Sequence, residues 1–382
     1  MERSPTTHHI PPQDAPKFHH LRLLRSRRVG PATYRRLLAE HGTARAALDA
    51  LPDIAAAAGV SDYSICPEGV VAAELKAGQK AGARLLMQGD PDWPAVIDDL
   101  PDAPPLLWGI GQVELLQRPM IAMVGARNAS SLGTRMAKAL AADLTAAGFV
   151  VVSGLARGID AAAHHAALQG GTVAVQAGGV DVVYPQENNA LAQQIGAQGL
   201  RLSEMPMGLQ PQARHFPARN RIIAGLSRAV VIVEAAAKSG SLITARNALD
   251  ANRDVLAVPG HPFDARAAGC NMLIRDGATL IRSAADVIEA VGTLPCVAPE
   301  LPLQMPDRPQ APDHPPKPLR GLRETAALHN LILNRLGVSP MAEDQLIRDL
   351  GGAAPVVTPA LVDLELEGLI ARSAGGLLSR TN

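Results

Sequence analysis

The sequence predicts an α/β protein with a doubly wound parallel sheet, an N-terminal helical domain and a C-terminal winged-helix domain. Three observations predict this class. Seven short apolar runs in the middle of the chain lack period-two alternation, which is typical of strands buried on both faces of a parallel sheet. Spacers of helix length separate the runs, as crossover connections require. A proline-rich stretch then sets off a compact C-terminal block.

The expected domains follow these shifts in composition, because 382 residues are too many for one ordinary core. Residues 1–17 are expected to be a disordered leader. Residues 18–90 are expected to form a small helical domain of the SAM or helix-hairpin-helix type, in which Gly30-Pro31 marks a sharp turn. That turn fits either a DNA-binding hairpin or an inert cap. Residues 105–292 form the sheet domain, with strands expected at 121–124, 149–153, 172–176, 200–203, 229–233, 255–258 and 278–281.

The last part of the chain divides into a linker and a small domain. Nine prolines within 293–320 predict an extended, semi-rigid linker. Residues 321–382 read as three helices followed by a hairpin, the order of a winged helix, with elements expected at 329–336, 343–350, 359–370 and 371–380. The third helix is acidic, which is the wrong sign for a phosphate backbone. This domain is therefore predicted to pack or to bind protein rather than to read duplex DNA.

Composition limits the class of protein further. The 36 basic and 36 acidic residues cancel, and a hydrophobic content of 47% indicates a globular chain. No apolar run reaches the length of a membrane helix, and the N-terminus lacks the apolar core of a secretory signal. Three scattered cysteines argue against a disulfide framework or a cysteine-based zinc site. We expect a cytoplasmic protein without a metal or a cofactor.

Positive charge is nevertheless concentrated in one segment. Seven Lys or Arg residues lie between Arg214 and Arg253, against two acidic residues. At its start, cations, an aromatic ring and an amide gather at Arg214, His215, Phe216, Arg219, Asn220 and Arg221. Aromatic residues make up only 2% of the chain, so Phe216 is not ordinary filler. Because cations suit phosphates and a ring suits an unpaired base, the segment predicts a site for single-stranded nucleic acid.

The loop after the first expected sheet strand predicts an anion site. It carries Gly125, Arg127 and Ser130 just before a helix, whose first N–H groups lack partners within the helix. The loop is neither a GxGxxG fingerprint nor a P-loop. Ser153 and Gly154 stand at the end of the next strand. A dinucleotide-binding fold has an acidic residue at that place to bind the ribose, so the sequence argues against binding of NAD. We expect both residues to line the same anion site.

The loop after the strand at 229–233 repeats this pattern. Its candidate phosphate ligands are Lys238, Ser239, Gly240, Ser241 and Thr244. Their N–H and hydroxyl groups suit a phosphate, and the lysine adds charge. Simple N-capping of the following helix is the alternative. Because the carboxyl ends of parallel strands meet at one edge of a sheet, the loops are expected to form one groove.

Two other polar features leave alternatives open. Asp160 and His164 are four positions apart on one helix and fit a metal half-site, an acid–base pair, or a contact that ties the helix to the sheet. We favour the last, since no third ligand or nucleophile is evident. Asp181, in the loop at 178–188, fits a ligand contact and ordinary loop packing equally well.

These segments together resemble the DNA-processing protein A family, also called DprA or Smf. The run at 216–227 is highly specific. The matching motifs, in the order of the family, are VGARNASSLG (124–133), SGLARGIDAAAHHAAL (153–168), GGVDVVYPQEN (178–188), FPARNRIIAGLS (216–227), VEAAAKSGSLITA (233–245), AVPG (257–260) and GCNMLIRDGA (269–278).

The resemblance implies an extended Rossmann-like core between a helical module and a winged helix. It implies a homodimer that binds and protects single-stranded DNA and helps to load RecA onto it during natural transformation, with no established enzymatic activity. Arg127 matches the arginine of the family's first turn. Ala126 stands where serine or threonine is usual, which removes a hydroxyl but no charge.

An enzyme of the lysine-decarboxylase-like class is the main alternative. Proteins of that class have a similar fold and similar loops, and they cleave nucleoside monophosphates with a glutamate in a PGGxGTxxE motif. The corresponding segment here reads SGSLITARNA (239–248) and has no glutamate near Thr244. Because glycosidic cleavage needs a positioned carboxylate, binding without chemistry is favoured. A nucleotide sensor stays open, since a loop that holds one DNA phosphate also suits a mononucleotide.

Overall fold

The computed structural model describes residues 16–292, 322–337, 340–351, 357–358, 360–361, 364–365, 368–373 and 377–381. The chain divides into two compact units, Met1–Cys296 and Val297–Asn382. The expected linker at 293–320 and all but the last two residues of the expected leader lie outside the described residues.

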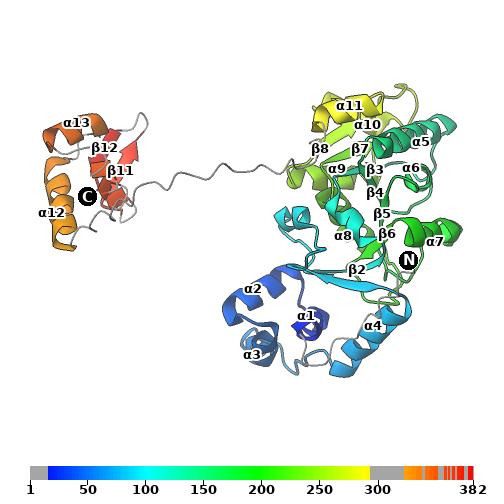
Figure 1. Cartoon of the computed structure of the whole chain (residues 1–382), viewed down its shortest axis with the longest axis horizontal. Helices are drawn as coiled ribbons and strands as arrows, with labels where there is room; N and C mark the ends of the chain where they lie inside the picture. The colour runs from blue at the N-terminus through cyan, green and yellow to red at the C-terminus, as the bar shows by residue number, and fades with distance from the viewer. Residues whose placement is uncertain are drawn as a thin grey trace, which may run out of the picture. The chain divides into compact units, whose positions relative to one another are not determined.

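A sheet organises the first unit (Figure 1). Its strand order is β1-β2-β6-β5-β4-β3-β7-β8-β9, and the run from β6 to β9 is parallel throughout. The strands are β1 (Arg84–Met87), β2 (Leu106–Gly111), β3 (Met120–Val124), β4 (Val150–Ser153), β5 (Thr172–Val175), β6 (Leu200–Ser203), β7 (Ala229–Ile232), β8 (Asp254–Ala257) and β9 (Thr279–Leu280). The chain leaves β3 toward β4 on one side and returns at β7 on the other, so the sheet is doubly wound, as predicted.

Helices cover both faces of this sheet. They are α5 (Ser131–Ala146), α6 (Ile159–Ala167), α7 (Asn189–Gln198), α8 (His215–Gly225), α9 (Ser241–Asp250), α10 (Ala268–Arg275) and α11 (Ala284–Val291). Ile121 and Met123 of β3 pack into the core formed with α5, α6 and α11. Ala122 and Val124 point into the opposite core, formed with α8, α9 and α10. Burial on both faces explains the continuous apolar runs.

Strands β1 and β2 are a difference from the sequence prediction. Both are antiparallel to their neighbours, and β1 lies within 18–90, where only helices were expected. The two strands are short. β1 pairs with β2, and β2 pairs with β6, for example Trp108 with Ser203. Such pairing depends on residues far apart in the sequence, so no local pattern indicates it. The domain boundaries expected from composition remain a prediction.

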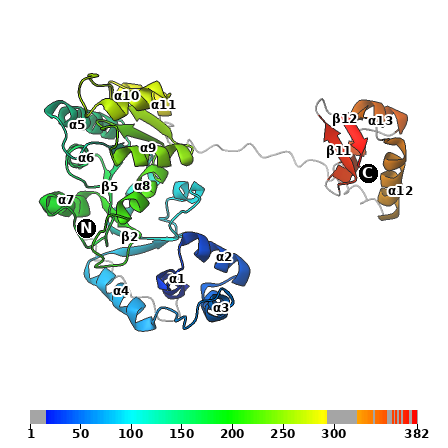
Figure 2. The ribbon, with the colours of Figure 1, turned by 180° about the vertical axis from the view of Figure 1, so that it is seen from behind.

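From residue 16 onward, the described helices that precede the sheet are α1 (Pro16–Arg25), α2 (Pro31–His41), α3 (Ala44–Ala57) and α4 (Glu68–Lys80). Pro31 occupies the first turn of α2, as the Gly30-Pro31 turn predicts. Helix α4 contacts β1, and the helical part lies next to β2 (Figure 2). Glu74 of α4 joins the two, because its carboxylate accepts hydrogen bonds from Arg25 (2.7 and 2.8 Å) and from the indole of Trp108 (2.9 Å).

The second unit contains the elements of a winged helix. They are α12 (Leu322–Arg335), β10 (Met341–Ala342), α13 (Glu343–Asp349), β11 (Ile370–Ser373) and β12 (Leu377–Arg380), with strand order β10-β12-β11. The expected third helix at 359–370 lies only partly within the described residues. Ile332, Leu346 and Leu378 are buried in the core of this unit. Throughout the described part of the chain, no helix has the length and apolar character needed to cross a bilayer.

Candidate nucleic-acid interface

A cleft of about 780 Å³ opens where the strand order reverses, between the ends of β3 and β7. The loops that follow these two strands lead to helices on opposite faces of the sheet. This leaves a crevice between the loops, as is usual at this point of a doubly wound sheet. The loops at 125–128 and 236–240 line two parts of it. Further lining comes from α8, from the start of α9, from Ala156 and Asp160 and from Arg266.

The cleft brings together many of the residues singled out in the sequence. Those that line it are Gly125, Arg127, Phe216, Arg219, Asn220, Lys238, Ser239, Gly240, Ser241 and Thr244. Those that do not are Ser130, Ser153, Gly154, Arg214, His215 and Arg221. The four loops were expected to meet at one edge of the sheet, and three of them contribute to this cleft. The fourth loop, at 178–188, does not line the cleft, but its Tyr184 lies against Phe216.

An aromatic ring and an exposed cation lie together in the cleft. The guanidinium carbon of Arg127 lies 5.5 Å from the centre of the Phe216 ring, within the range of a cation–π contact. Tyr184 is 49% exposed and its ring centre lies 5.7 Å from that of Phe216, tilted by 56°. Arg127 and Lys238 are exposed and form no ion pair with any residue of the described part of the chain. Both charges are therefore available to an external anion.

The start of α9 supplies hydrogen-bond donors to the same cleft. Ser239 and Ser241 share a hydrogen bond of 2.7 Å, and the Ser239 hydroxyl accepts one from the Ser241 N–H (3.3 Å). Thr244 is buried one turn further on. The N-cap position of α9 is Gly240, and no side chain caps the helix, so simple N-capping by a serine is not observed. Lys238 and Gly240 are exposed beside Ser239. A helix start next to an exposed lysine favours a bound anion.

Arg219 is a correction to the sequence prediction. It was expected to bind phosphate, but it is only 5% exposed and its guanidinium donates to the carbonyls of Gly154 and Val175, both at 2.6 Å. Burial lowers the pKa of Arg219 to about 10, and the nearby carboxylate of Asp160 opposes that shift. A Cβ at position 154 would collide with this guanidinium, which explains Gly154. Arg219 therefore holds strand ends together beneath the cleft.

Arg221 and His215 also turn away from the cleft. Arg221 forms ion pairs with Glu204 (2.6 Å) and Asp102 (2.8 Å), and its side chain is 12% exposed. His215 is buried, and its Nδ1 accepts a hydrogen bond from the Gln212 N–H (3.1 Å). The density of cations in the sequence did not reveal these inward-facing roles, because the same residue types serve phosphates and internal carboxylates equally well.

Arg214 and Ser153 likewise contact protein atoms. Arg214 is exposed outside the cleft and donates to Nε2 of His215 (3.3 Å). Ser153 is fully buried, and its hydroxyl donates to the Met123 carbonyl (2.6 Å). Ser153 thus couples β4 to β3, rather than facing a ligand.

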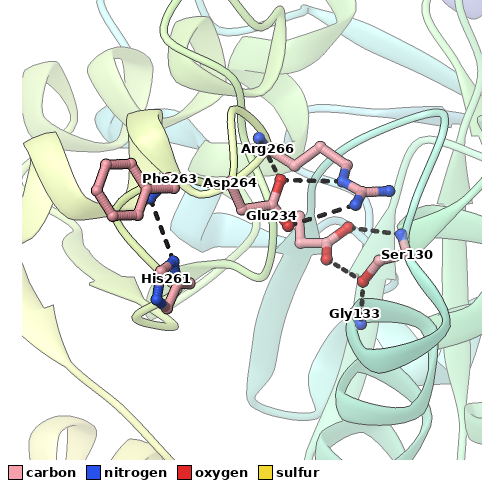
Figure 3. A network of polar contacts seen from close by, with 7 residues as sticks. All are labelled: Ser130, Gly133, Glu234, His261, Phe263, Asp264 and Arg266. Atoms are coloured by element: carbon pink, nitrogen blue, oxygen red, sulfur yellow. Dashed lines mark hydrogen bonds and ion pairs between the residues drawn. The ribbon is translucent and has the colours of Figure 1, made fainter.

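Glu234 was not among the site residues predicted from the sequence. It occupies the expected anion position at the start of α5 (Figure 3). Its carboxylate accepts a hydrogen bond from the Ser130 N–H (2.9 Å) and another from the Ser130 hydroxyl. The same hydroxyl oxygen caps α5 by accepting from the Gly133 N–H (2.9 Å). A carboxylate is stabilised at a helix N-terminus in the way that a phosphate would be. The Ser130 donors are thus already taken by the protein itself.

The signal for Glu234 was present in the sequence, as an acid directly after a buried strand and next to the switch point. Arg266 was also overlooked. It lines the cleft from the loop between β8 and α10, and in the sequence it stands in a stretch between two motifs. Only the parallel pairing of β7 with β8 brings that loop to the same edge of the sheet.

Asp160 and His164 do not contact each other as expected, but each binds the loop that follows β4. Asp160 accepts from the N–H groups of Gly154 (3.1 Å) and Ala156 (3.4 Å). His164 Nε2 accepts from the Leu155 N–H (3.3 Å), and its Nδ1 donates to Thr172 (2.7 Å), whose hydroxyl donates onward to a carbonyl. Both side chains therefore stabilise the loop, in which Leu155 adopts a left-handed φ of 56°.

This arrangement predicts a specific acid sensitivity. Burial lowers the pKa of His164 from 6.5 to about 3, and Arg219 and His165 nearby lower it further. A proton on Nε2 would also remove the acceptor for the Leu155 N–H. Below pH 6.5 the unfolded chain therefore binds a proton that the folded chain does not. The stabilising contribution of neutral His164 to the free energy of unfolding is therefore present above pH 6.5. About 2 kcal/mol of that free energy should be lost between about pH 7 and about pH 5.

Urea unfolding at both pH values measures this loss, and the His164→Gln variant is the control. Glutamine lacks a titratable group, so the variant should have a smaller decrease in unfolding free energy over the same pH range. An identical decrease in both proteins would contradict the assignment to His164.

Comparison with known proteins places the chain in a family. The family model described as DNA recombination-mediator protein A matches residues 84–292, more than half of the chain. The chain belongs to this family. A DprA-like N-terminal HHH domain model matches residues 14–77, and a DprA winged helix domain model matches residues 310–376. The resemblance to DprA and the predicted fold class are both confirmed.

Curated relatives of the DprA family extend this result. DNA processing protein DprA from Streptococcus pneumoniae is 47% identical over 201 residues, which cover 52% of this chain and 71% of that protein. Protein Smf from Synechocystis sp. is 43% identical over 227 residues, or 58% of this chain and 57% of that protein. The match thus spans little more than half the length of the Synechocystis relative.

Solved structures of DprA proteins have the same fold. The X-ray structure from Streptococcus pneumoniae aligns with a TM-score of 0.61 at 36% identity, covering 71% of this chain and 97% of that one. A Helicobacter pylori DNA processing protein A, described for its single-stranded DNA binding mode, aligns with a TM-score of 0.51 at 31% identity. That alignment covers 55% of this chain and 95% of the H. pylori chain.

Proposed function

We propose that this DprA-family protein binds single-stranded DNA in the cleft at the switch point, without catalysing a reaction on it. The observation that carries the proposal is the contact of Arg127 with Phe216, next to the exposed Lys238. Cations for phosphates and a ring for a base lie within one hollow. The single-stranded DNA binding of the Helicobacter pylori relative supports the proposal that this protein also binds single-stranded DNA.

Preference for a single strand follows from the chemistry of the ring. A base inside a duplex is already stacked on its neighbours, whereas an unpaired base is free to stack on Phe216. Every base has a π-face, so binding through this contact tolerates any sequence. The proposed contacts come from Arg127, Phe216, Asn220, Lys238 and the start of α9.

The absence of catalysis is supported by the carboxylates. Asp160 is the only acid among the described residues that line the cleft, and it is 5% exposed and bonded to backbone N–H groups. Glu234 is bound to Ser130. Glycosidic cleavage needs an acid next to the bond to be broken, and neither residue offers a free one. Glu234 also occupies the place at α5 where a dinucleotide fold holds its pyrophosphate, which disfavours a nucleotide sensor.

The proposal extends to the partners that the family resemblance implies. The bound strand would be protected and passed to RecA during natural transformation, in the cytoplasm, by a homodimer. Membership of the DNA recombination-mediator family supports this extension.

Titration of labelled single-stranded and duplex oligonucleotides, followed by fluorescence anisotropy over a series of salt concentrations, tests the proposal. The single strand should bind more tightly, and its log affinity should fall with log salt by about 0.7 for each phosphate contacted. Equal binding of both forms, or no binding of either, would overturn the proposed function.

Replacing Phe216 with alanine should weaken single-strand binding by roughly 5- to 150-fold, since a stacked base contributes about 1–3 kcal/mol. Residual duplex binding should change little. The same anisotropy titration measures both affinities, and Phe216→Trp, which keeps a stacking face, is the control. Equal losses on the two substrates would mean that Phe216 shapes the cleft rather than stacking on a base.

A further inference from the structure

The loop between β8 and α10 carries an exposed aromatic pair outside the cleft. Phe263 is 95% exposed, more than any other large apolar side chain of the described residues. The ring of His261 lies beside it, with 5.6 Å between ring centres and a tilt of 38° (Figure 3). Exposing a whole phenyl ring to water is unfavourable, and a ligand stacked on the ring would remove this cost.

Local hydrogen bonds hold the loop in shape. His261 Nδ1 accepts from the Phe263 N–H (3.3 Å), and the Asp264 N–H donates to the His261 carbonyl (2.9 Å). At the base of the loop, Asn271 bonds both the N–H (3.2 Å) and the carbonyl (2.9 Å) of Gly260. The backbone that carries the pair is therefore fixed by the loop itself, without help from a ligand.

The same loop borders the cleft. β8 pairs in parallel with β7, so the loop that follows β8 lies at the edge of the sheet where the cleft opens. Arg266 lines the cleft, and Asp264 orients it through bonds of 3.2 and 3.3 Å. Figure 3 shows Arg266 on the side of the loop facing Glu234, with Phe263 and His261 on its other side. A chain that leaves the cleft past Arg266 would therefore meet the aromatic pair next.

We propose that Phe263, supported by His261, is a second stacking position for an unpaired nucleobase of the strand held in the cleft. This inference rests on the proposed function and extends its footprint. Arg266 and Lys238 on the cleft side supply positive charge for the intervening phosphates. One ring presents a face the size of a base, far below the roughly 800 Å² per partner of a stable protein interface. A base of the same DNA strand is thus the ligand that the loop fits.

The two positions predict a dependence on strand length. Oligothymidylates of about 4 to about 16 nucleotides cover the site sizes typical of single-strand-binding folds. Phe263→Ala should leave the affinity for the shortest oligonucleotides unchanged and weaken the longer ones by about tenfold. Phe216→Ala, by contrast, should weaken binding at every length. Because Phe263 is almost fully exposed, its replacement should not disturb folding, and a thermal melt checks this.

A fluorescent reporter gives a second readout. Trp93 and Trp108, the two tryptophans of the chain, are buried, so Phe263→Trp adds one exposed indole to a constant background. A base stacked on that indole should quench its emission. Quenching should occur with long oligonucleotides and be absent with the shortest ones.

The outcomes separate the inference from the function on which it rests. If Phe263→Ala binds oligonucleotides of all lengths as tightly as the unaltered protein does, the stacking position is refuted. The aromatic pair would then be assigned to contact with a protein partner instead. An equal loss at all lengths also refutes it, since the loop then only shapes the cleft. Long oligonucleotides that bind without quenching the new indole refute it as well. Failure of the unaltered protein to bind any oligonucleotide refutes the proposed function itself.

Discussion

Replacing Arg127 with alanine should weaken single-strand binding by about 10- to 100-fold, one of the two largest effects expected for this protein. The side chain is exposed, carries a full charge and lies over Phe216. Its removal takes away a charge-assisted phosphate contact and exposes the stacking ring to water. The salt dependence of binding should also become shallower, by about 0.7 in slope for one lost phosphate contact. Anisotropy titrations at several salt concentrations measure both effects.

Arg135→Ala is the matched control for Arg127. Arg135 is exposed on the first turns of α5 and does not line the cleft, so its removal changes net charge equally. It should weaken binding only slightly. The thermal stability of both variants should match that of the unaltered protein. Equal losses of affinity in the two variants would mean that binding depends on overall charge and not on the cleft.

Replacing Arg219 with alanine should instead destabilise the fold, by about 3–5 kcal/mol in the free energy of unfolding. Two strand-end carbonyls lose their donor, and the buried carboxylate of Asp160 loses its neighbouring cation. Burial already raises the pKa of Asp160, and Arg219 is the largest influence opposing that rise. Urea unfolding at neutral pH measures the loss. An Arg219→Ala variant with normal stability but no DNA binding would contradict this structural role and would mean that Arg219 contacts the DNA.

A double variant tests the physical cause. Asp160→Asn removes the buried charge but keeps an oxygen to accept from Gly154 and Ala156. In the Arg219→Ala background this second change should therefore cost less than it does alone. The coupling expected for two interacting groups is about 0.5–3 kcal/mol. Strict additivity of the two changes would show that Arg219 acts only through the carbonyls.

The parallel part of the sheet was predictable because its strands are buried on both faces. Runs such as residues 121–124 and 229–233 are apolar at every position, and few other structures tolerate that pattern. Strands β1 and β2 were not predictable. β2 is placed by antiparallel pairing with β6, which lies about 90 residues further along the sequence, and β1 is placed by pairing with β2.

For the candidate site, the sequence indicated the segment but not the direction of each side chain. Phe216 and Asn220 are four positions apart on α8 and both line the cleft. Arg219 and Arg221 lie on the same helix, yet one binds carbonyls and the other binds Glu204. The helical period relates these residues to each other. It does not say which face of α8 meets the strand ends.

The sequence by itself determined the fold class, the edge of the sheet at which a binding site was predicted and the concentration of cations near Phe216. These are local properties, since apolar runs and turns act over a few residues. Only the tertiary structure decided which cations remain available. Arg219 is engaged by carbonyls from β4 and β5, and Ser130 by Glu234, 104 positions away. Whether a polar group meets an internal partner or an external ligand depends on what packing brings within hydrogen-bond distance, and that distance is set by the assembled sheet.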